Sequence, residues 1–301
     1  MKAAFIVALV FTAYAGPAIL EDENSEVLPQ SAVDYINSVQ DSWVASKEWV
    51  GTMTLGVAKS FASTTIKERE FEEYNWGALL ENLKAPVSFD SRTQWPGCVH
   101  PILDQGQCGS CWAFGAAEAL SDRLCIGSNG ATNVVLSPQY LVDCDTNSYG
   151  CNGGYPDLAW RFLQTKGLPT YTCVPYTAQD GSCPNSCSNG SAPVFYKAAS
   201  VNTYSGPASI QAAVLAGGPI EVSFTVYQDF FGYTSGVYIH TWGGVAGGHA
   251  VKLIGWGVSG SQNYWICANS WGTGWGIQGF FWIGFGQCGI DSSGVAGAPQ
   301  L

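Results

Sequence analysis

The chain has 301 residues and a net charge of −11, with few charged side chains and many glycines, tryptophans and cysteines. A chain of this length can bury the core of one large or two modest domains without help from a metal or a partner. Its acidity and the lack of any basic run exclude nucleic acid as a partner, because phosphate binding needs clustered Lys and Arg.

The first residues have the features of a secretory signal peptide. Met1-Lys2 is followed by an apolar run over 3–11 and by the small-residue exit Thr12-Ala13-Tyr14-Ala15, so we expect residues 1–15 to be removed by cleavage near Ala15. The run is too short to span a bilayer, and no later segment has about 18 uninterrupted apolar residues. A retained signal anchor is therefore the less favoured alternative, and we expect no membrane contact after signal cleavage.

Eleven cysteines, none before Cys98, indicate an oxidising compartment, because a reducing cytosol would leave most of them unpaired. The odd number leaves at least one thiol outside any intramolecular disulfide. In a secreted protein such a thiol either pairs with another chain or is reactive.

The composition changes at residues 84–86. Residues 16–85 are charged, free of cysteine and helical in part, with a stretch rich in Glu and Lys around 66–70, whereas residues 86–301 are poor in charge and rich in Gly, Trp and Cys. The first block can be a solvated N-terminal helix or a removable pro-segment. The signal peptide and the unpaired thiol favour the pro-segment, and we expect a new N-terminus between Leu83 and Val87 after processing.

The downstream block divides into a helical half, mainly residues 104–193, and a β half, mainly 194–290, which predicts an α+β fold. Apolar spacing predicts one helix from Cys108 to about Ile126 and a second from Pro156 to about Lys166. β-Branched and aromatic runs separated by Gly and Ser predict four strands, at 220–227, 249–256, 263–268 and 279–285.

Cys111 is the candidate nucleophile, because it stands in the first turn of the first predicted helix, within the run Gln105-Gly106-Gln107-Cys108-Gly109-Ser110-Cys111-Trp112. Unpaired backbone N–H groups and the helix dipole favour a thiolate there. A neighbouring imidazolium lowers the pKa of such a thiol further. The chemistry therefore needs a histidine.

Of the three histidines, His249 fits this requirement best. It follows Gly247-Gly248 at the head of a predicted apolar strand, where glycines let a substrate backbone approach closely. His100 precedes a proline and His240 ends a strand-like run, so we expect surface or turn roles for both.

A third group must hold the histidine in one orientation. Asn269 can do so as a hydrogen-bond acceptor, with Trp271 beside it to shield the bond from water. The oxyanion of a tetrahedral intermediate also needs donors, and the backbone N–H of Cys111 and the side-chain amide of Gln105 can supply them.

At this point the sequence resembles a known family. The run around Cys111 has the papain-type signature Cys-Gly-[Ser/Ala]-Cys-[Trp/Tyr]. His249 follows Cys111 by 138 residues, within the family range of about 130 to 150, and Asn269 follows it by 158, slightly beyond that range. The closer resemblance is to cathepsin B. It covers about residues 88–298 and includes five further segments, namely 89–96, 119–123, 151–156, 235–238 and 288–291.

The resemblance implies a papain-like fold of two lobes, a helical left domain and an antiparallel β-barrel right domain, with the active-site cleft between them. It implies Cys111, His249 and Asn269 as catalytic residues and Gln105 as the oxyanion glutamine, with no metal and no cofactor. It also implies substrate-binding positions, at Gly109, Gly153, Gly154, Tyr155, Gly248, Ala250, Trp271 and Ser293.

The resemblance further implies four disulfides, Cys98–Cys125, Cys108–Cys151, Cys144–Cys183 and Cys173–Cys187. Cys267 and Cys288 are then left over besides the nucleophile. Both stand in apolar strand context, so we favour buried free thiols over a fifth bridge.

Two departures from the cathepsin B pattern bear on specificity. In that family an occluding loop with paired histidines holds the C-terminal carboxylate of the substrate and makes the enzyme a dipeptidyl carboxypeptidase, whereas the span from Cys173 to Cys187 in this chain is short and has no histidine. We therefore expect an open cleft and endopeptidase activity. Ser293 stands where the family has an acidic residue that admits arginine into the S2 pocket, so with Tyr155 and Ala250 as further walls we expect an apolar P2 preference.

Two rival classes of protein fit parts of the sequence. A Cys-x-x-Cys pair such as Cys108 and Cys111 can belong to a zinc site or a redox pair, but no second such motif and no thioredoxin-like βαβ pattern accompanies it. A catalytically inactive papain-fold binding protein is the stronger rival, since a scaffold can persist without its site. The presence of all four catalytic positions disfavours it.

The favoured hypothesis is a cysteine endopeptidase made as a zymogen, with peptides and proteins as substrates and its own pro-segment as inhibitor. We expect a monomer of the secretory pathway, in a lysosome-like vesicle or outside the cell. Asn189-Gly190-Ser191 is the one glycosylation sequon, in a loop beside Cys187.

Overall fold

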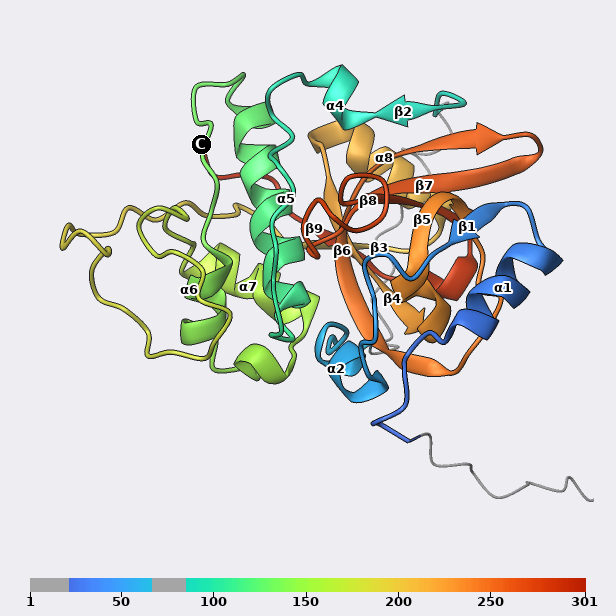
Figure 1. Cartoon of the computed structure of the whole chain (residues 1–301). Coiled ribbons are helices and arrows are strands. Elements are labelled where there is room, and N and C mark those ends of the chain that lie inside the picture. The colour runs from blue at the N-terminus through green and yellow to red at the C-terminus, as the bar shows by residue number, and fades with distance from the viewer. Residues whose placement is uncertain (1–21, 67–84) are drawn as a thin grey trace, which may run out of the picture.

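The computed structural model describes residues 22–66 and 85–301 (Figure 1). The predicted signal peptide and most of the Glu/Lys-rich stretch around 66–70 lie outside the described residues. Within those two ranges, no helix combines the length and the apolar character needed to cross a bilayer.

The helical lobe is organised around α5 (Cys111–Gly127), with α6 (Pro138–Cys144) and α7 (Pro156–Thr165) packed beside it (Figure 1). Every residue of α5 from Cys111 to Cys125 is buried, so this helix lies at the centre of the molecule. It begins three residues later than the apolar pattern predicted, because Cys108 is held in a disulfide and Ser110 takes the cap position. Ser137 caps α6 by accepting a hydrogen bond from the Tyr140 N–H.

The other lobe is built on one sheet. Its strands are β1 (Trp43–Ala45), β2 (Phe89–Asp90), β3 (Asn202–Tyr204), β4 (Ile220–Tyr227), β5 (Tyr233–Tyr238), β6 (Val245–Ser259), β7 (Gln262–Ala268), β8 (Phe280–Gly284) and β9 (Gly294–Ala296). The order is β1-β5-β8-β7-β6-β4-β9-β3, with β2 also paired to β6. The four strands predicted from the sequence correspond to β4, β6, β7 and β8, and β4 has the predicted limits.

The sheet is open, so the expectation of a closed β-barrel is wrong, although the two-lobe α+β fold is confirmed by its solved relatives. The two ends of the sheet are β1 and β3, and they do not pair with each other among the described strands. One edge of β5 is hydrogen-bonded to β1, which belongs to the N-terminal segment, the described residues 22–66. The pairing of β5 with β8 is parallel, unlike the other pairings of the sheet.

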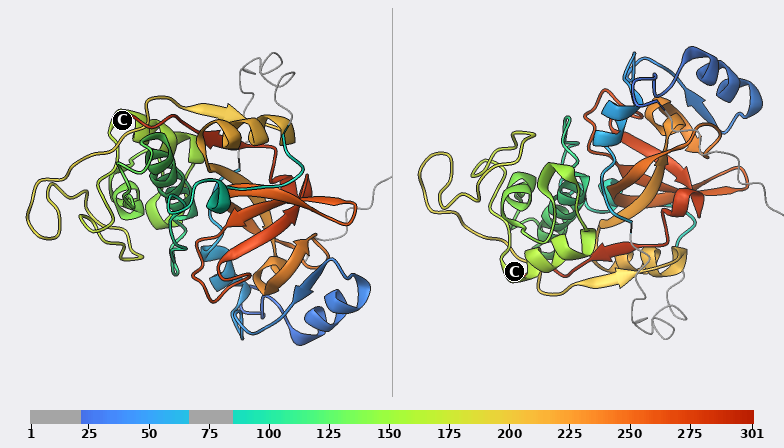
Figure 2. Two further views of the ribbon diagram at one scale, coloured as in Figure 1. Left: turned by 90° about the horizontal axis from the view of Figure 1, so that it is seen from above. Right: turned by 90° about the horizontal axis from the view of Figure 1, so that it is seen from below.

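Among the remaining described elements, the 3₁₀ turn at Gly150–Asn152 lies against α6 in the helical lobe and the others lie around the sheet. These remaining elements are α1 (Gln30–Val39), α2 (Leu55–Ser60), α4 (Ser91–Gln94), α8 (Pro207–Gly217) and 3₁₀ turns at Gly150–Asn152, Gln228–Gly232 and Gln287–Gly289. Figures 1 and 2 show α1, β1 and α2 on the outside of the sheet lobe, with α2 at the junction of the two lobes.

The N-terminal segment docks on the sheet lobe and then crosses the cleft. Trp43 donates its indole N–H to the carbonyl of Ile239 at 2.9 Å and packs on Tyr238. After α2 the chain makes isolated bridges, Ser63 with Gly248 in β6 and Thr64 with Gly154 just before α7. The same short stretch therefore contacts both lobes.

A buried charge cluster also joins the two lobes. Lys252 of β6 places its Nζ 2.8 Å from a carboxylate oxygen of Asp122 and 3.5 Å from one of Glu118, both on α5. His100 joins the cluster through its Nδ1, 2.7 Å from Asp122. The His100 side chain is only 9% exposed, so the expectation of a surface or turn role was wrong for this histidine.

Candidate active site

Cys111 opens α5 and is fully buried, beneath the N-terminal segment. Its sulfur lies 2.8 Å from the hydroxyl oxygen of Thr64. The sulfur also accepts a hydrogen bond from the backbone N–H of Ala250, which directly follows His249 in β6. The nucleophile of one lobe and the histidine of the other are therefore neighbours across the cleft.

His249 is held by Asn269. The Nε2 atom of the ring lies 2.7 Å from Oδ1 of Asn269, the residue that directly follows β7. The same Oδ1 accepts the N–H of Ser270 at 2.8 Å, which fixes the amide orientation. The other ring nitrogen, Nδ1, has no oxygen or nitrogen partner among the described residues, so it is available to exchange a proton with the thiol.

Trp271 shields this pair from water. Its indole is buried, and its ring centre lies 4.9 Å from that of His249. Phe231 stacks on the indole at 5.0 Å, and Trp49 of the N-terminal segment stacks on it at 5.6 Å. The Asn269–His249 hydrogen bond is thus enclosed by aromatic rings.

The thiol of Cys111 is acidified by its surroundings. Burial is the largest influence and raises the pKa, but the charge of His249 and a hydrogen bond with it lower the pKa, and the Thr64 hydroxyl and the Ala250 N–H lower it further. The result is a pKa of about 7, below the ordinary value of 9.0. A thiolate at near-neutral pH is what a sulfur nucleophile needs.

Gln105 stands three residues before Cys108 in the sequence, and its side chain contacts Cys108. Its Nε2 donates to the carbonyl of Cys108 at 2.8 Å and to that of Phe61, in the N-terminal segment, at 3.3 Å. Its Oε1 accepts from the Ser270 hydroxyl at 2.7 Å. One N–H of the Gln105 side-chain amide is therefore directed at the Cys108 carbonyl, and the other is directed at the Phe61 carbonyl in the cleft.

The predicted substrate-binding glycines line the path of the N-terminal segment. Gly248 accepts the Thr64 N–H at 2.9 Å, and Gly154 accepts the Thr65 N–H at 3.1 Å. A Cβ on Gly153 would lie 2.0 Å from the Ser63 carbonyl oxygen, and one on Gly248 would lie 2.1 Å from that of Thr64. Gly109 is equally close, since its Cβ would lie 2.5 Å from the Ser63 hydroxyl. These positions leave room for one extended backbone.

The structure places the remaining predicted pocket residues as follows. Ala250 is fully buried, and Tyr155 is half-buried at the start of α7. Ser293 is partly exposed just before β9, and its carbonyl accepts the Ser223 N–H. Their contacts with a bound substrate remain a prediction.

All four cysteine pairs implied by the resemblance are bonded, namely Cys98–Cys125, Cys108–Cys151, Cys144–Cys183 and Cys173–Cys187. Cys111, Cys267 and Cys288 are free, Cys267 being buried and Cys288 partly so. Burial raises the pKa of both spare thiols, so only Cys111 is acidified. Asn189 is exposed, and its Oδ1 accepts both the N–H and the hydroxyl of Ser191.

Three contributors to the site were not predicted. Ser270 stands beside Asn269 in the sequence, and that position was the only available signal for it. Thr64 and Tyr176 come from loops with no motif of their own, and Tyr176 donates its hydroxyl to the Gln105 carbonyl at 2.8 Å. In the described part of the chain, no group of His, Cys, Asp and Glu side chains is arranged to hold a metal ion.

The chain is similar to known proteins in sequence and in fold. The sequence model of the papain family cysteine proteases matches residues 85–298. The cathepsin B-like cysteine proteinase 5 of Caenorhabditis elegans is 39% identical, over 90% of this chain and 90% of its own length, and a gut-specific cysteine proteinase of the same species is 40% identical over 100% of both.

Solved proenzymes have the same fold. A procathepsin B from Trypanosoma congolense superposes with a TM-score of 0.84 at 32% identity, covering 92% of this chain and all of its own. A procathepsin L2 from the larval midgut of Tenebrio molitor gives 0.75 at 28% identity, covering 90% of this chain and 88% of its own.

The fold and the site define a cysteine-type peptidase that is made as a zymogen. The chain belongs to the papain family of cysteine proteases and is cathepsin B-like.

Proposed function

We propose that Cys111, His249, Asn269 and Gln105 carry out the hydrolysis. The observation that carries the proposal is the buried contact of an acidified Cys111 with His249, whose far nitrogen is held by Asn269. The thiolate attacks the peptide carbonyl carbon, and the oxyanion accepts hydrogen bonds from the Gln105 amide and the Cys111 N–H. Protonated His249 gives its proton to the leaving amine.

The second half of the reaction releases the acyl group. Neutral His249 takes a proton from water, whose oxygen attacks the thioester carbon. The carbon–sulfur bond breaks, a carboxylic acid leaves, and the thiolate–imidazolium pair is restored. His249 carries each proton, and the water molecule that enters the reaction replaces the proton given to the leaving amine, so the scheme needs no cofactor.

We propose residues 16–85 as the inhibitory pro-segment. It occupies three parts of the machinery: Thr64 contacts the Cys111 sulfur, Phe61 takes the free N–H of Gln105, and Trp49 covers Trp271. Removal by cleavage between Leu83 and Val87 is supported by the exposure of Val87, which is 78% exposed. A substrate carbonyl would then take the place of Phe61.

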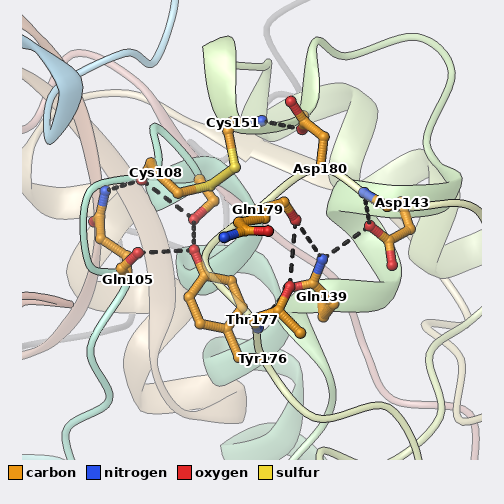
Figure 3. Close-up of a disulfide and its surroundings, with 12 residues drawn as sticks. Gln105, Cys108, Gln139, Asp143, Cys151, Tyr176, Thr177, Gln179 and Asp180 are labelled. Carbon is orange, nitrogen blue, oxygen red and sulfur yellow. Dashed lines mark hydrogen bonds between the residues drawn. A yellow bond between two sulfur atoms is a disulfide. The ribbon is translucent and has the colours of Figure 1, made fainter.

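Endopeptidase activity is supported by the position of the short loop between Cys173 and Cys187. Thr177 binds Gln139, Gly181 donates to Asp143, and Asp180 accepts the Cys151 N–H, so the loop is tied back onto the helical lobe (Figure 3). A loop held there leaves the end of the cleft open to a chain that continues past the scissile bond. Together with Ser293 in place of an acid, this supports internal cleavage after an apolar P2 residue.

The cellular setting follows from the same reasoning. A signal peptide at 1–15, four disulfides and a glycosylation sequon at Asn189 support a secreted or lysosome-like monomer that acts on peptides and proteins.

The test is stoichiometric labelling of the processed enzyme with a peptidyl epoxide. We expect one label per chain, lost in Cys111→Ala and retained in Cys267→Ala, which removes a buried free thiol away from the site. A papain-fold binding protein would take up no label. A peptide labelled at both ends and quenched internally then distinguishes internal cleavage from the removal of C-terminal dipeptides. Loss of C-terminal dipeptides alone would overturn the endopeptidase assignment.

A further inference from the structure

The short loop that follows Cys173 contributes one side chain to the interior of the site. Tyr176 extends from this loop to the turn that carries Gln105, and its hydroxyl lies between Gln105 and Ser110 (Figure 3). It donates to the Gln105 carbonyl at 2.8 Å and lies 2.6 Å from the Ser110 hydroxyl. Ser110 directly precedes the nucleophile.

The direction of these hydrogen bonds follows from the available protons. The Gln105 carbonyl can only accept, so Tyr176 must give its single hydroxyl proton to it. The Ser110 hydroxyl therefore donates to Tyr176. The three groups form a chain of hydrogen bonds from Ser110 through Tyr176 to Gln105, in which each bond strengthens the next.

The backbone of Gln105 is consequently held from both lobes, on both sides of its Cα. The N–H of Gln105 donates to the carbonyl of Ser270, beside Asn269, at 2.8 Å, while the C=O is held by Tyr176 of the helical lobe. The side chain begins at this fixed Cα, and its amide must lie within hydrogen-bond distance of the oxyanion. A shift of this backbone would move the donor directly.

Tyr176 is itself held firmly. Its ring packs edge-on against Phe114 of α5 with centres 4.7 Å apart. The residues after it are fixed by Gln139, whose Oε1 accepts the Thr177 N–H at 2.9 Å and whose Nε2 donates to the Gln179 carbonyl at 2.8 Å. The loop is thus anchored on both sides of the point where it meets Gln105.

From this geometry we propose that Tyr176 is a positioning residue for oxyanion stabilisation, acting through the backbone of Gln105. The inference rests on the oxyanion role proposed above for Gln105. The short loop between Cys173 and Cys187 then has two roles: it leaves the cleft open, and it supports catalysis by holding Gln105 in place.

The test compares Tyr176→Phe with the unchanged enzyme after processing. Phenylalanine keeps the ring on Phe114 and removes only the hydroxyl, so we expect kcat to fall roughly three- to tenfold with KM unchanged. Alkylation of Cys111 by iodoacetamide passes through no oxyanion, so its rate and pH profile should stay the same. Tyr140→Phe is the matched control, since it removes the hydroxyl of a partly buried tyrosine in the same lobe and should leave kcat within twofold.

A double-mutant cycle separates positioning from a general structural effect. In the Gln105→Ala background the loss caused by Tyr176→Phe should disappear, because no amide remains to be positioned. An undiminished loss in that background, a parallel fall in alkylation rate, or an unchanged kcat in Tyr176→Phe would each overturn the inference.

The single variants also distinguish the oxyanion role of Gln105 from the positioning role of Tyr176. If Gln105→Ala leaves kcat unchanged, the proposed oxyanion role fails and the inference fails with it. If Gln105→Ala lowers kcat and Tyr176→Phe does not, only the inference fails. Should Tyr176→Phe not fold, Ser110→Ala takes its place in the cycle, because it removes the other partner of the hydroxyl and leaves the ring in position.

Discussion

The hydroxyl oxygen of Thr64 lies 2.8 Å from the sulfur of Cys111, across 47 positions of the chain. A hydroxyl is therefore a group that the N-terminal segment presents to the proposed nucleophile. The bridges of Ser63 to Gly248 and of Thr64 to Gly154 are parallel and hold the backbone of the segment in the cleft. The segment thus fills the site and places a hydroxyl against the sulfur.

Replacement of Thr64 by valine should weaken this inhibition. Valine has the same shape but cannot bond to the sulfur, and the loss of one hydrogen bond should speed self-processing of the zymogen roughly two- to tenfold. The appearance of the mature band at a fixed acid pH measures the rate. Thr65→Val is the matched control because Thr65 is exposed. Equal processing rates in both variants would show that the Thr64 hydroxyl does not contribute to inhibition by the N-terminal segment.

Release of the N-terminal segment should lower the pKa of Cys111. In the zymogen the pKa is about 7, with burial as the largest cause and acting upward, whereas the Thr64 hydroxyl acts downward and ranks below the two effects of His249. Removing the segment relieves part of the burial that raises the pKa of Cys111. It loses only the Thr64 hydrogen bond, which lowers that pKa and is the smaller of the two effects. The pKa of the mature enzyme should therefore lie below that of the zymogen, and the thiolate should persist to a more acid pH.

Thiolate absorbance in the far ultraviolet measures this shift, taken as the difference between each form and its Cys111→Ala counterpart, the mature counterpart being made by adding active enzyme to the variant zymogen. For the zymogen, stopped-flow pH jumps can be read before processing begins. If the mature enzyme had the higher pKa of the two forms, burial by the segment would not outweigh the Thr64 hydrogen bond.

Loss of the Asn269 amide should lower kcat/KM roughly 10- to 150-fold, because a hydrogen bond to a charged imidazolium is lost. Asn269→Ala makes the change, and the fluorescence of a quenched peptide reports it. Asn263→Ala, at an exposed position in β7, the strand that ends directly before Asn269, should leave the rate close to that of the unchanged enzyme. A similar fall in both variants would point to damage to the strand instead of a role in orienting His249.

The sequence was sufficient to place the proposed reacting groups because each stands in a motif with a chemical reason. Cys111 opens a helix, His249 follows two glycines in a strand, and Asn269 directly follows the next strand. The limits of β4 were also predictable, since its β-branched and aromatic run is bounded by Gly218 and Pro219 on one side and a 3₁₀ turn on the other.

What the sequence could not reveal depends on contacts between distant segments. Tyr176 and Thr64 meet the site only because two loops fold against it. His100 is drawn out of solvent by Asp122, which in turn is paired with Lys252 on the other lobe. The pairing of β1 with β5 is another contact of this kind, because β1 comes from outside the predicted peptidase domain and lies far from β5 in the sequence.

The stability of the protein should depend on the protonation of Glu221. This residue of β4 is fully buried, and one carboxylate oxygen accepts the Trp160 indole N–H at 2.8 Å. The other oxygen has no hydrogen-bond partner among the described residues. Burial is the main cause that raises its pKa well above the ordinary value of 4.5.

The sign of the effect follows from proton binding. Above pH 4.5 the unfolded chain releases the proton of Glu221 while the folded protein keeps it, so the folded state binds more protons and the free energy of unfolding falls as pH rises. Below that pH Glu221 is protonated in both the folded and the unfolded chain, so it adds no pH dependence to the free energy of unfolding. The fold should therefore be more stable at about pH 5 than at neutral pH, which suits a lysosome-like vesicle.

Glu221→Gln tests this in a Cys111→Ala background, which prevents self-processing. Glutamine can still accept the Trp160 hydrogen bond but cannot ionise, so the fall in Tm from about pH 5 to neutral pH should be smaller in this variant. Glu48→Gln, at an exposed position, should retain the full fall. If the Glu221 variant lost as much Tm over that range as the Glu48 variant does, ionisation of the buried carboxyl would not be what weakens the fold at neutral pH.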